Sequence, residues 1–123
     1  MKQALILGGT RGLGLSLAWE GYTRQVRPII TGRSADLQTL ASFPPSYAFF
    51  KLDLSNPESV EQIGRRKAEP IDYLFWVAGN FYRGPFDQTS PEILESMIAT
   101  HLSGPVRALE LFQLGLHYIL NRP

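Results

Sequence analysis

The sequence predicts an α/β protein, with a doubly wound parallel sheet of strand order 3-2-1-4 and helices on both faces. Three observations predict this fold. Short apolar runs alternate with helical patterns four times, and a glycine-rich segment separates the first run from the first helix. The run Tyr73–Ala78 is apolar at nearly every position, as in a parallel strand buried on both faces. Right-handed crossovers then place the first two helices on one face and the last two on the other, provided that the chain returns past the first strand after the third.

The first half of the chain contains three predicted strands and two predicted helices. Ala4–Leu7 is a short apolar run and forms the first strand, and a helix with apolar residues at helical spacing follows from Gly12 to about Gln25. Pro28–Thr31 is the second strand, with its proline at the entry, where it costs no ladder bond. Ser34–Ser42 is a short second helix, and the aromatic-rich Tyr47–Leu52 is the third strand.

Cap signals mark the helices of the second half. Asn56-Pro57 is typical of an N-cap followed by Pro at the first helical position, and it opens a helix through Lys67. Tyr73–Ala78 is the fourth strand. Ser90-Pro91 repeats the cap signal before a long fourth helix. Gly104-Pro105 predicts an interruption of that helix, because Pro lacks the amide donor and clashes one turn back.

Composition limits the class of protein. A chain of 123 residues fits one domain, here residues 1–123, and a net charge of +1 without a basic stripe indicates no nucleic-acid or anionic-membrane partner. The absence of cysteine excludes disulfides and thiolate metal sites and fits a reducing compartment, and two scattered His predict no metal site. No apolar stretch is long enough to span a membrane. We therefore expect a cytoplasmic protein.

A glycine-rich turn is the main functional motif. Its spacing is G-x-x-x-G-x-G, directly after the first strand and at the opening of the first helix, the context in which such a turn binds a dinucleotide. Glycines let the backbone approach a pyrophosphate, and a helix N-terminus favours an anion. A glycine-rich turn without a ligand is the alternative. The residues expected to bind the cofactor here are Gly8, Thr10, Arg11, Gly12, Leu13 and Gly14.

Arg33 stands at the end of the second predicted strand, where NAD-binding sites usually carry an acidic residue for the ribose hydroxyl. A guanidinium can instead bind a ribose 2′-phosphate with paired hydrogen bonds, and Ser34 follows it. Arg11 is a second cation near the same place. These residues favour NADP(H) as the cofactor. The alternative is that both arginines are solvated surface residues.

With these motifs, the sequence resembles the short-chain dehydrogenase/reductase family, whose Rossmann-like fold has the turn T-G-x-x-x-G-x-G; Leu7 stands here in place of its Thr. The resemblance covers residues 5 to about 104. It implies that Asp53-Leu54 contacts adenine and that Ala78-Gly79 is the end of the family's N-N-A-G motif. It also implies that the fourth helix is one that helps to form dimers in many members.

Three residues depart from the family pattern. Trp76 and Val77 replace the two Asn of N-N-A-G, and His101 occupies the place of an Asn that supports a proton-relay water. A His can also hold a water or relay a proton. The alternative is that His101 only caps or packs beside Gly104-Pro105.

The family's reaction needs a Ser and a Tyr-x-x-x-Lys pair on one helix, which the resemblance places beyond the fourth helix, whereas this chain stops at Pro123. The chain's own Tyr47 and Lys51 have this spacing but lie in a predicted strand, roughly 13 Å apart, so that the lysine cannot tune the phenol.

We therefore expect the N-terminal portion of an NADP(H)-dependent oxidoreductase acting on a carbonyl or hydroxyl, truncated after the fourth helix. It would take a small-molecule substrate only with a C-terminal half. The alternative is a non-catalytic dinucleotide-binding module whose short form is the working protein.

The fourth strand also predicts self-association. With strand order 3-2-1-4, Tyr73–Ala78 becomes an edge with apolar side chains and without Lys, Pro or Gly to protect it. The fourth helix adds a stripe of Leu109, Phe112 and Leu116. We expect the chain to associate through this edge or this helix. The alternative is that the fourth helix or the loop Asn80–Phe86 folds over the edge and the chain stays monomeric.

Overall fold

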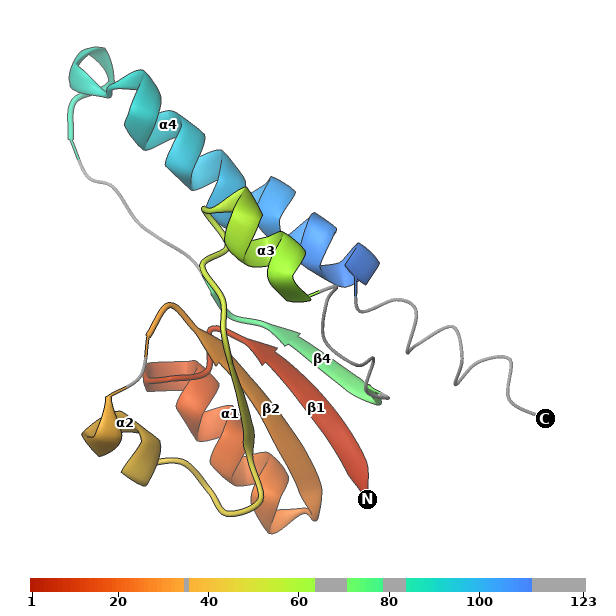
Figure 1. Ribbon diagram of the computed structural model, residues 1–123. Helices are drawn as coiled ribbons and strands as arrows, with labels where there is room; N and C mark the ends of the chain where they lie inside the picture. Colours follow the sequence, from red (N-terminus) through yellow and green to blue (C-terminus); the bar gives the residue numbers. More distant parts are fainter. Residues whose placement is uncertain (35, 64–70, 79–83, 112–123) are drawn as a thin grey trace.

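The computed structural model describes residues 1–34, 36–63, 71–78 and 84–111 (Figure 1). In chain order its strands and helices are β1 (Lys2–Leu7), α1 (Gly12–Thr23), β2 (Val26–Gly32), α2 (Leu37–Ala41), β3 (Ala48–Lys51), α3 (Pro57–Ile63), β4 (Tyr73–Trp76) and α4 (Pro91–Ile98). A 3-10 turn, Phe86–Gln88, precedes α4, and a π-helical segment, Ala99–Ser103, follows it. The chain is α-helical again from Gly104 to Leu111.

The sheet has the predicted topology. All its strands are parallel, in the order β3-β2-β1-β4 (Figure 1). β1 is central, and its Ile6 pairs with Ile30 of β2 on one side and with Phe75 of β4 on the other. Because parallel strands point the same way, their carboxyl ends meet at one edge of the sheet, where ligands bind in folds of this kind.

Helices cover both faces of the sheet as expected, with α1 and α2 on one face and α3 and α4 on the other (Figure 1). Alternate residues of β1 and β2 supply the two cores. The core under α3 and the last helix includes Leu5, Leu7, Ile29, Val60 and Ala108. The core under α1 and α2 includes Ile6, Ala18, Ile30 and Phe43.

β2 begins earlier than predicted. It starts at Val26, so that Pro28 lies inside the strand and fully buried rather than at its entry. The ladder between β2 and β3 begins only at the pair Ile29–Ala48. Pro28 therefore precedes the first pair on that side, and its missing amide costs no bond in the β2–β3 ladder.

Two other boundaries differ because particular hydrogen bonds decide them. β4 ends at Trp76, two residues before the predicted end, where the amides of Val77 and Ala78 both donate to the Leu7 carbonyl, at 3.0 and 2.6 Å. α2 begins after Asp36 rather than at Ser34, because the Asp36 carboxylate accepts the Thr39 amide and caps the helix.

The predicted interruption of the fourth helix was wrong. The helix continues through the π-helical segment, in which the Gly104 amide donates to the carbonyl of Ala99, five residues back. Pro105 then lies in the first turn of the resumed α-helix, where a missing amide is tolerated. The wider π turn therefore accommodates the proline without breaking the helix.

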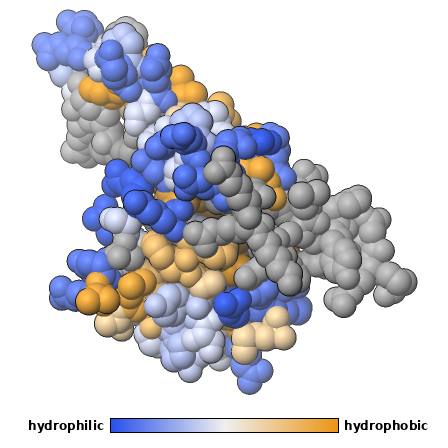
Figure 2. Space-filling model, viewed as in Figure 1, coloured by the Kyte–Doolittle hydropathy of each residue, from blue (hydrophilic) through white to orange (hydrophobic). Residues whose placement is uncertain are grey.

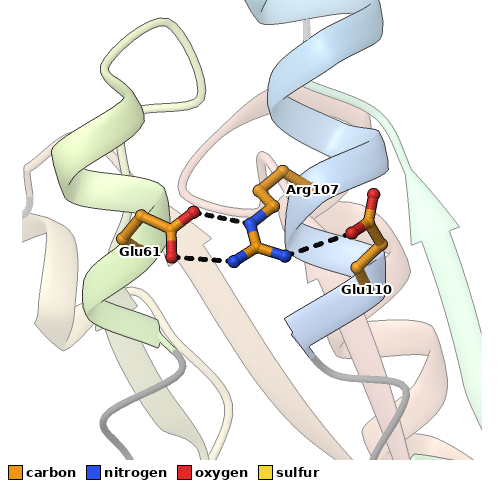
Figure 3. A network of polar contacts seen from close by, with 3 residues as sticks. All are labelled: Glu61, Arg107 and Glu110. Atoms are coloured by element: carbon orange, nitrogen blue, oxygen red, sulfur yellow. Dashed lines mark hydrogen bonds and ion pairs between the residues drawn. The ribbon is translucent and has the colours of Figure 1, made fainter.

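One bidentate ion pair joins the last helix to α3. Both carboxylate oxygens of Glu61 accept from Arg107: Nε to Oε1 is 2.5 Å and Nη2 to Oε2 is 3.0 Å (Figure 3). Glu110 accepts from the third nitrogen at 3.1 Å, and these contacts raise the pKa of Arg107. Among the described residues, no helix is long and apolar enough to cross a membrane.

Candidate functional site

The glycine-rich turn leaves β1 at the carboxyl edge of the sheet, and Thr31 of β2 holds it there. Thr31 is a buried polar residue whose hydroxyl donates to the Ile6 carbonyl at 3.0 Å and accepts the Gly8 amide at 3.2 Å. The Gly9 amide donates to the Thr31 carbonyl at 2.9 Å. Three hydrogen bonds therefore fix the start of the turn against the end of β2.

Glycine is required at two positions of this turn. Gly8 has a φ of +90°, and a Cβ there would lie 2.7 Å from the backbone of Ala78. A Cβ on Gly14 would lie 2.1 Å from the carbonyl oxygen of Gly8. The turn thus packs against the residues after β4 on one side and against the first turn of α1 on the other.

The N-terminus of α1 lacks the side-chain cap that the other helices have. Asp36 and Ser90 cap α2 and α4, and the Asn56 side chain accepts the Glu58 amide at the start of α3. At α1 the N-cap residue is Arg11, which makes no capping hydrogen bond, and the first turn contains no acidic residue. Among the described residues, no side chain caps this end of α1, so its backbone amides and positive dipole end could bind an anion.

A cavity of about 560 Å³ opens at the carboxyl ends of the strands. Its walls come from the glycine turn, the segments after β2, β3 and β4, and α4. The lining residues are Gly8, Thr10, Arg11, Gly12, Thr31, Gly32, Arg33, Ser34, Thr39, Leu52, Asp53, Leu54, Ser55, Val77, Ala78, Ser96 and Thr100.

Most residues expected to bind the cofactor come together in this lining. Three of them, and the catalytic candidate His101, are not among its residues. Leu13 is 65% exposed and lies outside the lining, and Gly14 lies beneath the turn. Gly79 is outside the described residues. His101 is exposed within the π-helical segment and is not among the residues that line the cavity.

Arg11 and Arg33 line the same cavity although one belongs to the glycine turn and the other follows β2. Asp36, the first carboxylate after Arg33, is directed elsewhere: its Oδ1 accepts the Thr39 amide at 2.7 Å. Hydrogen bonds from Thr39 hold the pKa of Asp36 below its usual value. Arg33, after β2, and Arg11, in the glycine turn, therefore both line the cavity, and the first acidic residue after Arg33 is used as a helix cap.

The loop after β3 contributes an ordered carboxylate. Asp53 Oδ1 accepts the amide and the hydroxyl of Ser55, at 3.0 and 2.6 Å, and the Asp53 amide donates to Ser59 Oγ at 2.9 Å. Sequence reasoning missed Ser55. An Asp followed two residues later by Ser is a pattern typical of an Asx-turn, and that pattern could have indicated it.

α4 supplies a wall that sequence reasoning also missed. Ser96 and Thr100 line the cavity, one helical turn apart. Gly104, a further turn on, lies against the loop after β3, because a Cβ there would be 2.0 Å from the Leu54 carbonyl oxygen. These small residues recur every four positions, which is the available signal that this face of the helix lies against other backbone.

The Tyr47 and Lys51 pair has the strand geometry that the sequence predicts. Lys51 is the last residue of β3, and Tyr47 directly precedes the strand and packs its ring edge-on against Phe43, with centroids 5.1 Å apart. The pair does not share a helix face.

The described residues also hold no group of three or more His, Cys, Asp or Glu placed to bind a metal ion.

Comparison with known families agrees with this geometry. Residues 2–116 match the family model described as short chain dehydrogenase. This chain belongs to the short-chain dehydrogenase family. Members of the family use a nicotinamide dinucleotide cofactor, which is the class of ligand expected at the cavity. The matched segment includes every strand, the glycine turn and α4.

Two curated relatives are longer than this chain. An uncharacterised oxidoreductase of Schizosaccharomyces pombe is 27% identical over 120 residues, and the short-chain dehydrogenase srdE of Neurospora crassa is 32% identical over 123 residues. Each alignment covers 90% of this chain but 47% and 40% of the respective relative. The chain therefore spans less than half the length of either protein.

Solved structures show the same fold. A short-chain dehydrogenase from Streptomyces avermitilis is similar with a TM-score of 0.80 at 22% identity, over 94% of this chain and 44% of that one. A short chain dehydrogenase/reductase family protein is similar with a TM-score of 0.82 at 25% identity, over 94% of this chain and 49% of that one.

Proposed function

We propose that this chain binds NADP(H) in the cavity and forms the nucleotide-binding portion of an oxidoreductase that acts on a carbonyl or hydroxyl substrate. One observation carries the choice of NADP(H): Arg11 and Arg33 line the cavity together, while Asp36 is held at the start of α2. A guanidinium forms charge-assisted paired hydrogen bonds with a 2′-phosphate, whereas a carboxylate at the end of β2 would repel it.

The other residues of the lining fit the remaining parts of a dinucleotide. The pyrophosphate is expected at the uncapped N-terminus of α1, where Gly8 and Gly12 leave room for the approach of phosphate oxygens. Asp53 and Leu54 are expected beside adenine, and Ala78 and Gly79 beside the part of the cofactor that reaches β4. When bound, the nicotinamide supplies the hydride.

Calorimetric titration of the full chain with NADPH and with NADH tests this proposal. We expect NADPH to bind roughly ten- to a hundred-fold more tightly, because a charge-assisted hydrogen bond contributes about 1.5–3 kcal/mol. Equal affinities would contradict the choice of NADP(H). Binding of neither cofactor would contradict the nucleotide-binding function itself.

A second candidate is a dinucleotide-binding module without turnover. It is favoured by Trp76 and Val77, which stand where the family has Asn, and by His101, which is exposed outside the cavity lining. Both candidates share the cofactor site. Sequencing the coding region that follows Pro123 distinguishes the two candidates, because the oxidoreductase requires a Ser and a Tyr-x-x-x-Lys pair in the same protein. NADPH oxidation by that protein should then depend on these residues.

We also propose that the chain associates with a second copy through α4. Exposed apolar side chains recur every fourth residue along this helix and its continuation: Leu94, Ile98, Leu102 and Val106, with exposed fractions of 53%, 49%, 60% and 43%. In Figure 2 apolar surface lies beside polar surface along the helix that Figure 1 labels α4.

The residues that the sequence suggested for association through this helix are not the ones in the exposed stripe. Leu109 is half-buried, and residues 112 and 116 are outside the described part of the chain. The edge of β4 is the competing contact, with Tyr73, Leu74 and Trp76 each about two-fifths exposed.

A further inference from the structure

Thr31 is the only buried polar side chain among the described residues, and it lies in a part of the sheet that is otherwise apolar. Its neighbours in β1 and β2 include Ile6 and Ile30, which are fully buried. A hydroxyl at such a position costs stability unless it is hydrogen-bonded. This hydroxyl bonds to Ile6 and to Gly8, so its polar contacts are made with the end of β1 and the start of the glycine turn.

The Gly8 amide takes a side-chain acceptor because the backbone leaves the sheet at this residue. Gly8 has a φ of +90°, and the Thr31 carbonyl accepts the next amide, that of Gly9, at 2.9 Å. The Thr31 hydroxyl accepts the Gly8 amide at 3.2 Å while it donates to the Ile6 carbonyl at 3.0 Å. Removal of the hydroxyl would therefore take this acceptor away from a backbone amide at the point where the turn begins.

The other side of the turn is held by backbone groups. The Leu7 carbonyl accepts the amides of Val77 and Ala78, and a Cβ on Gly8 would meet the backbone of Ala78. The β1–β2 ladder is likewise made by backbone atoms. A substitution at Thr31 can therefore remove the hydroxyl and leave the remaining hydrogen bonds of this region in place.

The end of β2 that carries Thr31 also carries Arg33. Between them lies Gly32, where a Cβ would overlap the methyl group of Thr10, so the end of β2 packs against the middle of the turn as well. NADPH has its pyrophosphate and its 2′-phosphate on the same ribose. The two places that would receive these groups must therefore keep a fixed separation, and a site that is already held in this arrangement loses less entropy on binding.

We propose that Thr31 is a positioning residue for NADP(H): its hydroxyl holds the Gly8 peptide, so that the turn receives the pyrophosphate at a fixed distance from Arg33. The proposal rests on the NADP(H) binding proposed above. Thr31 acts here through the turn. Its loss should therefore weaken a ligand that contains the pyrophosphate and spare a ligand that reaches only Arg33.

Titration of the full chain with NADPH and with adenosine 2′-monophosphate, which has no pyrophosphate, tests this role. Thr31→Val keeps the shape of the side chain and removes the hydroxyl. We expect it to weaken NADPH binding about three- to tenfold, the range for one neutral hydrogen bond, and to leave the binding of adenosine 2′-monophosphate unchanged. Calorimetry measures the affinity for NADPH, and shifts in the NMR spectrum measure that for the smaller nucleotide.

Thr31→Ser and Thr31→Ala form a second pair of chains, which differ from each other by the hydroxyl alone. The Ser variant is expected to bind NADPH as the wild type does, and the Ala variant about three- to tenfold more weakly. This pair carries the test if Thr31→Val does not fold, which thermal unfolding reveals. Thr23→Val is the control, because it removes a hydroxyl that bonds to the Glu20 carbonyl at 2.7 Å outside the cavity lining, and it should bind both ligands normally.

Four results would overturn the role of Thr31 or the function on which it rests. Equal affinity for NADPH within either pair would show that the hydroxyl does not position the turn. Equal weakening of both ligands would show that Thr31 only supports the fold of the site. If the wild type binds NADPH but not adenosine 2′-monophosphate, the two phosphate-binding places are not separate and the positioning role fails. If the wild type binds neither ligand, the proposed nucleotide-binding function itself fails, which distinguishes that failure from the other three.

Discussion

Gly14 lies so close to the carbonyl oxygen of Gly8 that a Cβ on Gly14 would stand 2.1 Å from that oxygen. The added carbon would meet backbone rather than the end of a flexible side chain, so that either the turn or the start of α1 would have to move. Because Gly14 has no side chain, the N-terminus of α1 can pack directly against the turn that leaves β1.

Gly14→Ala is expected to lower the free energy of unfolding by about 1–3 kcal/mol, the range for overpacking, and to abolish NADPH binding. Thermal unfolding and titration measure the two effects. Gly21→Ala is the matched control: it lies within α1, and its Cβ would meet Val26 at an ordinary 3.7 Å. That variant should be more stable by about 0.5–1 kcal/mol and bind normally. Equal effects of both substitutions would contradict the close approach.

Arg33→Ala is expected to remove most of the preference for NADPH over NADH. The loss should come from weaker NADPH binding, by roughly ten-fold or more, with NADH binding nearly unchanged, because only NADPH carries the 2′-phosphate. Arg27→Ala is the control, since Arg27 bonds to Gln3 and Ser46 and is absent from the cavity lining. A preference that survives in Arg33→Ala would show that the guanidinium is a solvated surface group.

Asp36 gives the fold a pH-dependent contribution. Its pKa is lowered from 3.8 in the folded chain by the hydrogen bonds of Thr39, so its contribution is present above the unfolded pKa and is lost as pH falls through the folded pKa. Asp36→Asn keeps a capping side chain without a titrating charge. We expect the wild type to melt at a higher temperature than this variant at neutral pH, and the difference to shrink as the pH falls through the lowered pKa of Asp36. A difference independent of pH would contradict this assignment.

Tyr47→Phe is expected to leave NADPH binding unchanged, together with any NADPH oxidation observed with assorted ketones and aldehydes. The reason is that Tyr47 directly precedes β3 and Lys51 is its last residue, so the two side chains do not share a helix face. The ring contact with Phe43 survives the substitution, so the melting temperature should also hold. Turnover that disappears in this variant would restore the pair as a catalytic one.

The chain is expected to form a dimer at high micromolar concentration through α4. Ile98→Lys puts a charge into the middle of the exposed apolar stripe and should give a monomer, whereas Leu74→Lys on β4 should not. Light scattering after size-exclusion chromatography measures the mass. The reverse pattern would place the contact on the edge of β4, and a monomeric wild type would refute association.

Chain order and local pattern were enough to predict the sheet. The apolar runs that became β1 and β4, the glycine turn between β1 and α1, and the cap-and-proline signal of Ser90-Pro91 are each encoded by a few adjacent residues. Right-handed crossovers, with the chain returning past the first strand after the third, then give the order 3-2-1-4 without any knowledge of side-chain contacts.

The ends of elements and the course of the last helix depended on contacts between distant residues. Gly104-Pro105 is a break signal by itself, but a π turn joined to the Ala99 carbonyl, with Gly104 packed on Leu54, keeps the helix continuous. Likewise, Pro28 is compatible with an inner strand only because β3 begins pairing one residue later.

The sequence by itself determined the fold, the glycine turn and the two arginines after β1 and β2, because these are set by spacing along the chain and by the rule that parallel strands share a carboxyl edge. Only the tertiary structure decided which side chains form the remaining walls. Thr31, Ser55 and Thr100 enter the cavity and His101 does not, because the direction of each side chain depends on strand register and on the rotation of a packed helix. Those quantities arise from contacts across the sheet, which no local pattern contains.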